Sequence, residues 1–99
     1  MSRIPSELVE KVLAATDLVA LIGSYIPVTR AGPFYKALCP FHHEESPSFN
    51  INPSRQFFHC FGCKKTGDAI TFVRNRENLS FTDAVRLLAA RAGIEIPES

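Results

Sequence analysis

The sequence is poor in cysteine and histidine, with three of each among 99 residues, and it contains no tryptophan. An odd number of cysteines excludes a framework made only of intrachain disulfides, which use cysteines in pairs. No apolar run approaches the roughly 20 residues that a membrane-spanning helix needs. The N-terminus lacks the basic and then apolar pattern of a secretory signal. We therefore expect a single small domain that is cytoplasmic and does not enter a membrane.

All three cysteines and all three histidines lie in the 39–63 stretch. Four of them form a C-x2-H pair and a C-x2-C pair with seventeen residues between the pairs. Two residues between ligands let one tight turn direct both side chains at a single ion, and thiolate with imidazole selects zinc over magnesium or calcium. The spacing predicts one structural zinc, bound by Cys39, His42, Cys60 and Cys63.

Two other histidines compete for this assignment. His43 would make a C-x3-H pair with Cys39 and is the alternative to His42. His59 precedes Cys60 in an expected strand, where alternation turns neighbouring side chains to opposite faces. We therefore expect His59 to point away from the metal.

The main alternative to a structural zinc site is a catalytic zinc site built from the same residues. Residues 42–44, histidine-histidine-glutamate, followed by C-x2-C loosely match the signature of zinc deaminases, in which Glu44 would move protons and a water would be the fourth ligand. Cys39 argues against it, because a fourth protein ligand closes the site. His59 also stands where that signature has proline. We predict no catalytic residue in this chain.

Residues 1–26 have apolar side chains at helical spacing, which predicts two helices. Ser6 is the expected N-cap of the first helix, and Thr16 or Asp17 starts the second. Residues 67–99 are helical again. The expected N-caps there are Thr66 or Asp68, and then Ser80 in a capping box with Asp83, and Gly93 ends the last helix. The apolar stripe predicted for the last helix consists of Phe81, Val85, Leu88 and Ala92.

Residues 27–66 change to the period of two that is typical of strands. Two short strands are expected on either side of a turn at 31–33, and two more on either side of a turn at 53–54. In the third strand, 49–52, phenylalanine and isoleucine face one side and two asparagines face the other. The sequence predicts an α+β fold: a zinc ribbon in which a small antiparallel β-meander is clipped by one zinc and flanked by N- and C-terminal helices. The 1–99 stretch would be one domain.

The net charge of +1 is unevenly distributed. Residues 30–76 carry seven basic and three acidic side chains, whereas the two flanking segments are acidic. Basic groups and exposed aromatic rings together bind single-stranded nucleic acid. Phe57 and Phe58 are adjacent in a strand, so one can serve the core while the other is exposed. The cations expected to contact DNA phosphates are Arg30, Lys36, Arg55 and Lys64.

Four motifs, "CPFH", "SPSF", "FHCFGC" and "GDAI" followed by Phe72, occur in this order. In order and spacing they resemble the N-terminal zinc-binding domain of bacterial DnaG-type DNA primases, a CHC2-type zinc ribbon. The likeness extends over nearly the whole chain. It implies the same four zinc ligands that the spacing predicts. The sequence departs from the usual pattern at Lys64, where members commonly have glycine, and at Glu45, where many have lysine nearby.

The resemblance implies a part in replication. The parent primase, a nucleotidyltransferase, would synthesise RNA primers on a single-stranded DNA template, and this module would bind the template and help to recognise the start site. Nucleotide transfer would belong to a separate catalytic domain with Mg²⁺, and contact with the replicative helicase to a C-terminal domain; this chain contains neither. The alternative is a zinc ribbon that mediates protein contacts in a replication or mobile-element protein.

Overall fold

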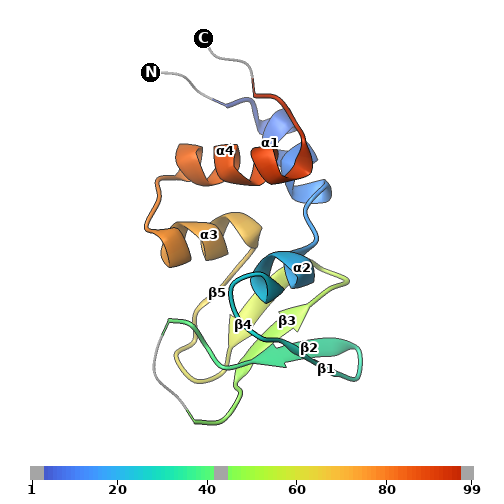
Figure 1. Cartoon of the computed structure of the whole chain (residues 1–99), viewed down its shortest axis with the longest axis vertical. Coiled ribbons are helices and arrows are strands. Elements are labelled where there is room, and N and C mark those ends of the chain that lie inside the picture. The colour runs from blue at the N-terminus through green and yellow to red at the C-terminus, as the bar shows by residue number, and fades with distance from the viewer. Residues whose placement is uncertain (1–3, 42–44, 97–99) are drawn as a thin grey trace.

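The computed structural model describes residues 4–41 and 45–96. Two helices are followed by five strands and two more helices, and the molecule is elongated, with extents of 45 × 24 × 19 Å. In Figure 1 the sheet forms the lower end and helices α1 and α4 the upper end. The elements are α1 (Ser6–Ala14), α2 (Leu18–Gly23), β1 (Thr29–Ala31), β2 (Phe34–Ala37), β3 (Phe49–Asn52), β4 (Phe57–Cys60), β5 (Thr66–Gly67), α3 (Ala69–Glu77) and α4 (Phe81–Ala92).

The five strands form one antiparallel sheet in the order of the sequence. This confirms the α+β fold and the predicted meander. Strand β5 was not predicted, because two residues give no alternating pattern. Thr66 lies in this strand, paired with His59, and is not the start of a helix. The N-cap of α3 is Asp68, whose Oδ1 accepts a hydrogen bond from Thr71 N at 3.0 Å.

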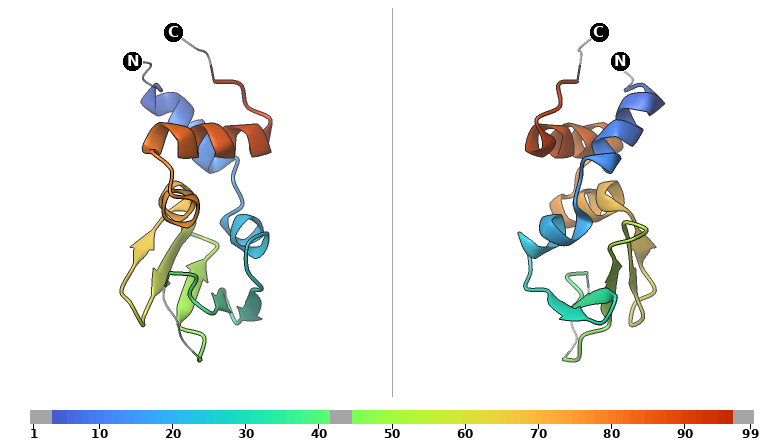
Figure 2. Two further views of the ribbon diagram at one scale, coloured as in Figure 1. Left: turned by 60° about the vertical axis from the view of Figure 1, so that its left-hand side comes forward. Right: turned by 90° about the vertical axis from the view of Figure 1, so that its right-hand side faces the viewer.

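One face of the sheet is covered and the other is open. Phe49 and Phe58 are fully buried on the covered face and stack with ring centroids 5.0 Å apart. Phe72 of α3 meets both rings, and α2 lies on the same side. In the right-hand view of Figure 2, none of the helices drawn covers the other side of strands β3–β5. We call this open side the outer face.

The helix ends follow most of the expected caps. Asp17 caps α2, since its Oδ1 accepts from Val19 N and Ala20 N. Ser80 accepts from Asp83 N at 3.1 Å, and Gly93 ends α4 with φ of 73°. The prediction for Ser6 was wrong. Ser6 is the first residue of α1, and Pro5 holds the N-cap position without a side-chain hydrogen bond.

The apolar stripe of α4 is buried at Val85 and Leu88, but Phe81 is 44% exposed. Phe81 is the first residue of the helix, and helical side chains lean toward the N-terminus, so its ring projects beyond the packed surface. Across residues 4–41 and 45–96, no helix has the length and apolar character needed to cross a bilayer.

Candidate metal centre and outer sheet face

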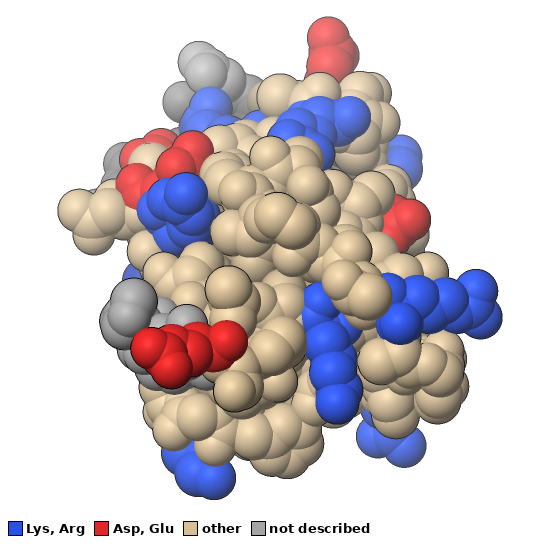
Figure 3. All heavy atoms as spheres, turned by 60° about the horizontal axis from the view of Figure 1, so that its bottom comes forward, with Lys and Arg blue, Asp and Glu red and all other residues tan. Residues whose placement is uncertain are grey.

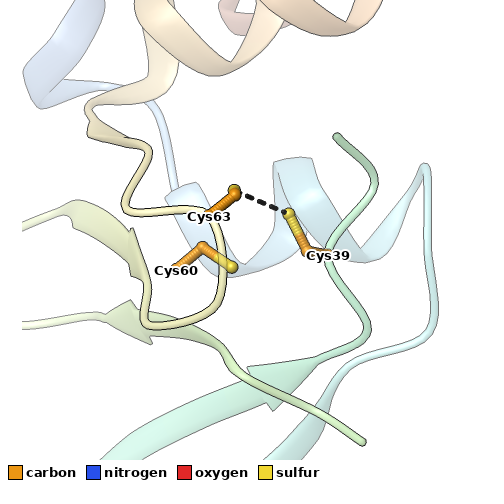
Figure 4. Close-up of side chains that lie close together, drawn as sticks. All are labelled: Cys39, Cys60 and Cys63. Atoms are coloured by element: carbon orange, nitrogen blue, oxygen red, sulfur yellow. Dashed lines mark hydrogen bonds between the residues drawn. The ribbon is translucent and has the colours of Figure 1, made fainter. Parts of the chain in front are cut away.

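Three cysteines from separate parts of the meander meet at one point. Cys39 follows β2, Cys60 ends β4, and Cys63 lies in the turn before β5. Their three Sγ atoms all lie within 4.8 Å of one another, and Figure 4 shows them directed together. Cys39 and Cys60 are buried, and Cys63 is half-buried. The structure therefore brings together three of the four predicted zinc ligands.

The sulfur spacing fits a metal better than a disulfide. The Sγ atoms of Cys39 and Cys63 are 3.7 Å apart, whereas a disulfide bond is about 2.05 Å long. Two thiolates at about 2.3 Å from a tetrahedral zinc are about 3.8 Å apart. The observed separation matches this value. A soft three-sulfur donor set is also typical of zinc rather than of magnesium or calcium.

The fourth predicted ligand, His42, lies outside the described residues, together with His43 and Glu44. The chain enters this segment through Phe41, whose backbone N–H donates to Cys39 Sγ at 3.4 Å. The choice between His42 and His43 therefore stays a prediction.

A tight backbone turn shapes the C-x2-C pair. Lys64 N donates to Cys60 O at 2.8 Å, and Cys60 N donates to Lys65 O at 2.8 Å. These two bonds fold the chain back on itself around the Cys60 sulfur. Lys64 has φ of 68°, in the left-handed region that glycine adopts without a Cβ penalty. This is the position at which the resemblance to primases would place glycine.

The cysteines differ in acidity. Burial raises the pKa of the Cys39 thiol to about 12. Burial acts in the same direction on Cys60, but hydrogen bonds from Ser48 and from the backbone of Cys63 and Gly62 outweigh it and lower the pKa to about 7. Ser48 Oγ lies 3.5 Å from Cys60 Sγ. Binding of a metal at neutral pH must therefore displace a proton from Cys39, since thiolates are the metal ligands.

His59 does not join the cysteines. It lies on the outer face, paired with Asn50 and Thr66, and its ring meets Phe61 edge-on with centroids 4.6 Å apart. The prediction from strand alternation is confirmed for this residue.

The outer face contains a hollow of about 270 Å³. Asn50 and Asn52 of β3 lie between Phe34 of β2 on one side and residues of β4 on the other. Phe58 faces the core and Phe57 borders this hollow, so the two adjacent rings lie on opposite faces of the sheet, as expected. The six lining residues are Phe34, Asn50, Asn52, Phe57, His59 and Phe61.

Sequence reasoning did not single out Phe61, which lies in the "CFGC" turn and is 57% exposed. A large aromatic side chain between two expected ligands in a tight turn has no core to enter. The position of Phe61 between the two cysteines could therefore have predicted that its ring is exposed.

The four cations predicted to contact DNA are all exposed but do not share one face of the sheet. Lys36 lies on the outer face in the row that contains Asn50. Arg30 pairs with Tyr35, which places it on the opposite face. Arg55 lies in the β3–β4 turn, and Lys64 follows the metal site. Figure 3 shows basic side chains spread around the sheet end of the molecule.

The family model described as the CHC2 zinc finger matches residues 4–99. The chain belongs to this family. Family membership and the cysteine cluster together indicate a zinc-binding site at Cys39, Cys60 and Cys63.

Several DNA primases are similar to this chain. Those of Neisseria meningitidis serogroup A and Geobacillus stearothermophilus are each 45% identical to it, over 96% and 95% of the chain. The chain spans only 16% of the length of either relative. The solved structure of the zinc-binding and RNA polymerase domains of Aquifex aeolicus primase matches the whole chain with a TM-score of 0.85 at 36% identity, over 23% of that protein.

Proposed function

We propose that this chain is the zinc-binding, template-binding module of a DNA primase. The relatives described above are named DNA primases, and the fold and the cysteine cluster of this chain agree with the zinc-binding domain of such a protein. The bound zinc would be structural: Cys39, Cys60 and Cys63 with His42 would close a four-ligand site and join β2 to the β4–β5 turn. Structural sites of this kind contribute about 10–16 kcal/mol of apparent binding free energy to folding.

The outer face is the observation that supports template binding. Exposed aromatic rings border a mostly apolar hollow that Asn50 and Asn52 also line, and Lys36 stands beside it. Stacking on an aromatic ring contributes about 1–3 kcal/mol per base, and cations track the phosphates. Arg55 and Lys64 would contact phosphates at the ends of β4. Arg30 would contribute from the edge of the sheet, because β1 is an edge strand with nothing beyond it among the described residues.

The remaining parts of the proposal concern the longer protein. The parent enzyme would make RNA primers in the cytoplasm, and this module would help to recognise the start site. Nucleotide transfer and Mg²⁺ binding would belong to a catalytic domain, and helicase contact to a C-terminal domain. We propose that residues 1–99 form one domain, because one continuous apolar core joins the helices to the sheet. The isolated chain should synthesise no primer.

One observation favours protein contacts as a second candidate. An apolar groove of about 620 Å³ runs beside β1 and β2, and Leu38 in it is 49% exposed. A neighbouring domain of the longer protein would bury such a groove. The groove and the hollow share no lining residue, but Lys36, proposed above to contact a phosphate, also lines the groove, so a domain that covered the groove would compete with the template for this side chain.

Fluorescence anisotropy of the zinc-loaded chain with a labelled single-stranded oligonucleotide tests the proposal. Three to four phosphate contacts predict that log affinity falls against log salt with a slope of roughly −0.7 per contact. Charge reversal at Lys36 and Arg55 together should weaken binding and flatten this slope, with the zinc content unchanged. Lys11→Glu, at the far end of the molecule on α1, is the matched control. Absence of binding at low salt, or no effect of the double reversal, would contradict template binding and leave protein contacts as the better candidate.

A further inference from the structure

The polar groups in the floor of the outer hollow are not equivalent. Asn52 Oδ1 accepts a hydrogen bond from Arg55 N at 3.1 Å. A backbone N–H can only donate, so the oxygen of this amide must face the turn, and the NH₂ group is the end of the amide that has no hydrogen-bond partner among residues 4–41 and 45–96. At Asn52 the NH₂ donors are therefore the groups most available to a ligand, because the oxygen already accepts from Arg55 N.

Asn50 offers both kinds of group. Within residues 4–41 and 45–96, no group hydrogen-bonds its side chain, although the residue is half-buried. Its amide oxygen and NH₂ are both available to a molecule in the hollow. Together the two asparagines on β3 present one acceptor and two separate donor groups to whatever lies between the aromatic walls.

The hollow is large enough to hold one aromatic ring system. Its volume is about 270 Å³, below the roughly 300–1,000 Å³ of pockets that hold drug-sized ligands. Phe34 and Phe57 lie on either side of β3 and can contact the faces or edge of a flat ring. The strands leave no backbone donor to serve such a ring from the centre of the sheet, because β3 is paired on both sides.

We propose that this hollow holds one unstacked pyrimidine base of the DNA strand, and that the Asn52 NH₂ group selects a pyrimidine over a purine. The inference rests on the proposed template binding and deepens it. Single-stranded bases are read on their Watson–Crick edges. Any base can pair with the Asn50 amide, because each offers a neighbouring donor and acceptor on that edge.

Asn52 is the residue that would distinguish a pyrimidine from a purine. Next to N3, both cytosine and thymine carry the acceptor O2, which accepts from the Asn52 NH₂ group. Adenine has a C–H at the equivalent place, and guanine has an NH₂ donor. A purine would leave the Asn52 donors unpaired or facing another donor, and unpaired polar groups in a partly buried site are costly.

The test uses zinc-loaded protein and a DNA dodecamer in which every position is abasic except one base at the centre. With a single base in the strand, only that base can occupy the hollow. Four versions, with dC, dT, dA or dG, are compared with the wholly abasic strand by anisotropy at low salt. Each base should bind more tightly than the abasic strand. The pyrimidines should bind about three- to tenfold more tightly than the purines, the value of one hydrogen bond. Purines have the larger stacking surface, so stacking alone would give the opposite order.

Asn52→Asp is the critical variant. An aspartate keeps the oxygen that accepts from Arg55 N but has no donor, so the turn is preserved, and the ratio of pyrimidine to purine affinity should fall below one because its second oxygen can accept from the guanine NH₂ group. The added negative charge weakens binding of the DNA backbone to all four strands, and at the base it adds to the loss of the pyrimidine preference because it repels the pyrimidine O2. Asn75→Asp, on the exposed side of α3, adds the same charge elsewhere and should leave the ratio unchanged.

The outcomes separate the two proposals. If none of the DNA strands binds the protein, the proposed template binding is wrong, and the inference about base selection is wrong with it. If bases bind better than the abasic strand but without a pyrimidine preference, or if Asn52→Asp keeps the preference, only the base selection is wrong.

Discussion

The side-chain Oε1 of Gln56 accepts a hydrogen bond from Leu18 N at 2.8 Å, across 38 positions of the sequence. Leu18 is the first residue of α2, whose backbone N–H groups need partners outside the helix. The other end of the Gln56 amide donates to Pro53 O at 2.6 Å, within the β3–β4 turn. One side chain therefore fixes this turn to the start of the helix, and it does so from a backbone with φ of 55°.

Gln56→Ala should lower the free energy of unfolding by about 1–2 kcal/mol, since it removes this cap and leaves the left-handed backbone in place. Urea unfolding of the zinc-loaded chain measures the change. Ser54→Ala in the same turn is the control and should be neutral, because Ser54 is exposed. Equal stability of the two variants would show that Asp17 alone suffices to start α2.

Gly67→Ala should be destabilising by about 1–3 kcal/mol, the usual effect of overpacking. A Cβ at Gly67 would lie 2.5 Å from Thr71 Cβ, so β5 and the first turn of α3 would have to separate. Gly23→Ala is the matched control: its Cβ would meet Val28 Cγ2 at 3.6 Å, an ordinary contact, at the end of a helix. Thermal unfolding should show a lower Tm for the first variant and an equal or higher Tm for the second.

Lys64→Gly should raise the free energy of unfolding by up to about 1.5 kcal/mol. Relief of the left-handed strain gives about 1–2 kcal/mol and the entropy of glycine opposes it with about 0.5–1 kcal/mol. Lys65→Gly removes the same charge at a residue without positive φ and should be destabilising. Both variants should weaken DNA binding at low salt. A loss of stability in Lys64→Gly would mean that the lysine side chain makes a compensating contact.

The sequence allowed the metal cluster and the meander to be predicted because both depend on short-range spacing. Two C-x2 pairs fix where ligands lie in a turn, and alternation fixes which side chains share a face. The same alternation predicted that Phe57 and Phe58 would lie on opposite faces of the sheet and that His59 would point away from the cysteines.

The rest depends on strand pairing and tertiary contact. Arg30 and Lys36 face opposite ways because the turn at 31–33 sets a register in which Arg30 opposes Tyr35. The left-handed Gln56 is held by its bond to Leu18, a partner that no local pattern reveals. The hollow of the outer face likewise forms only when β2, β3 and β4 align.

Cys60→Ser should abolish stoichiometric zinc binding. The Cys60 Sγ lies within 4.8 Å of both other sulfurs, and a serine hydroxyl is a poor ligand for zinc at neutral pH. Metal analysis after dialysis measures zinc content, and circular dichroism measures the strand content that should fall with it. Ser46→Ala, an exposed substitution outside the cluster, is the control. One zinc per chain in Cys60→Ser, with an unchanged fold, would exclude the proposed ligand set.

Zinc affinity should rise with pH, and the dependence should be steeper near pH 6 than near pH 8. The pKa of Cys39 is raised to about 12, so in the metal-free chain its thiol keeps its proton throughout this range and must release it on binding. The pKa of Cys60 is lowered to about 7, so Cys60 is mostly ionised at pH 8 but mostly protonated at pH 6, where it adds close to one further proton. Each released proton corresponds to a tenfold change of affinity per pH unit.

Competition with a chromophoric chelator across this range measures the slope. Ser48→Ala is the informative variant, because loss of the hydroxyl that lies 3.5 Å from the sulfur should raise the pKa of Cys60 and move the steeper region toward higher pH. Its affinity at pH 7 should then fall several-fold, while the affinities of the two proteins converge above the new pKa. A slope that is the same at pH 6 and pH 8 would show that the hydrogen bonds around Cys60 do not hold it as a thiolate before the metal arrives.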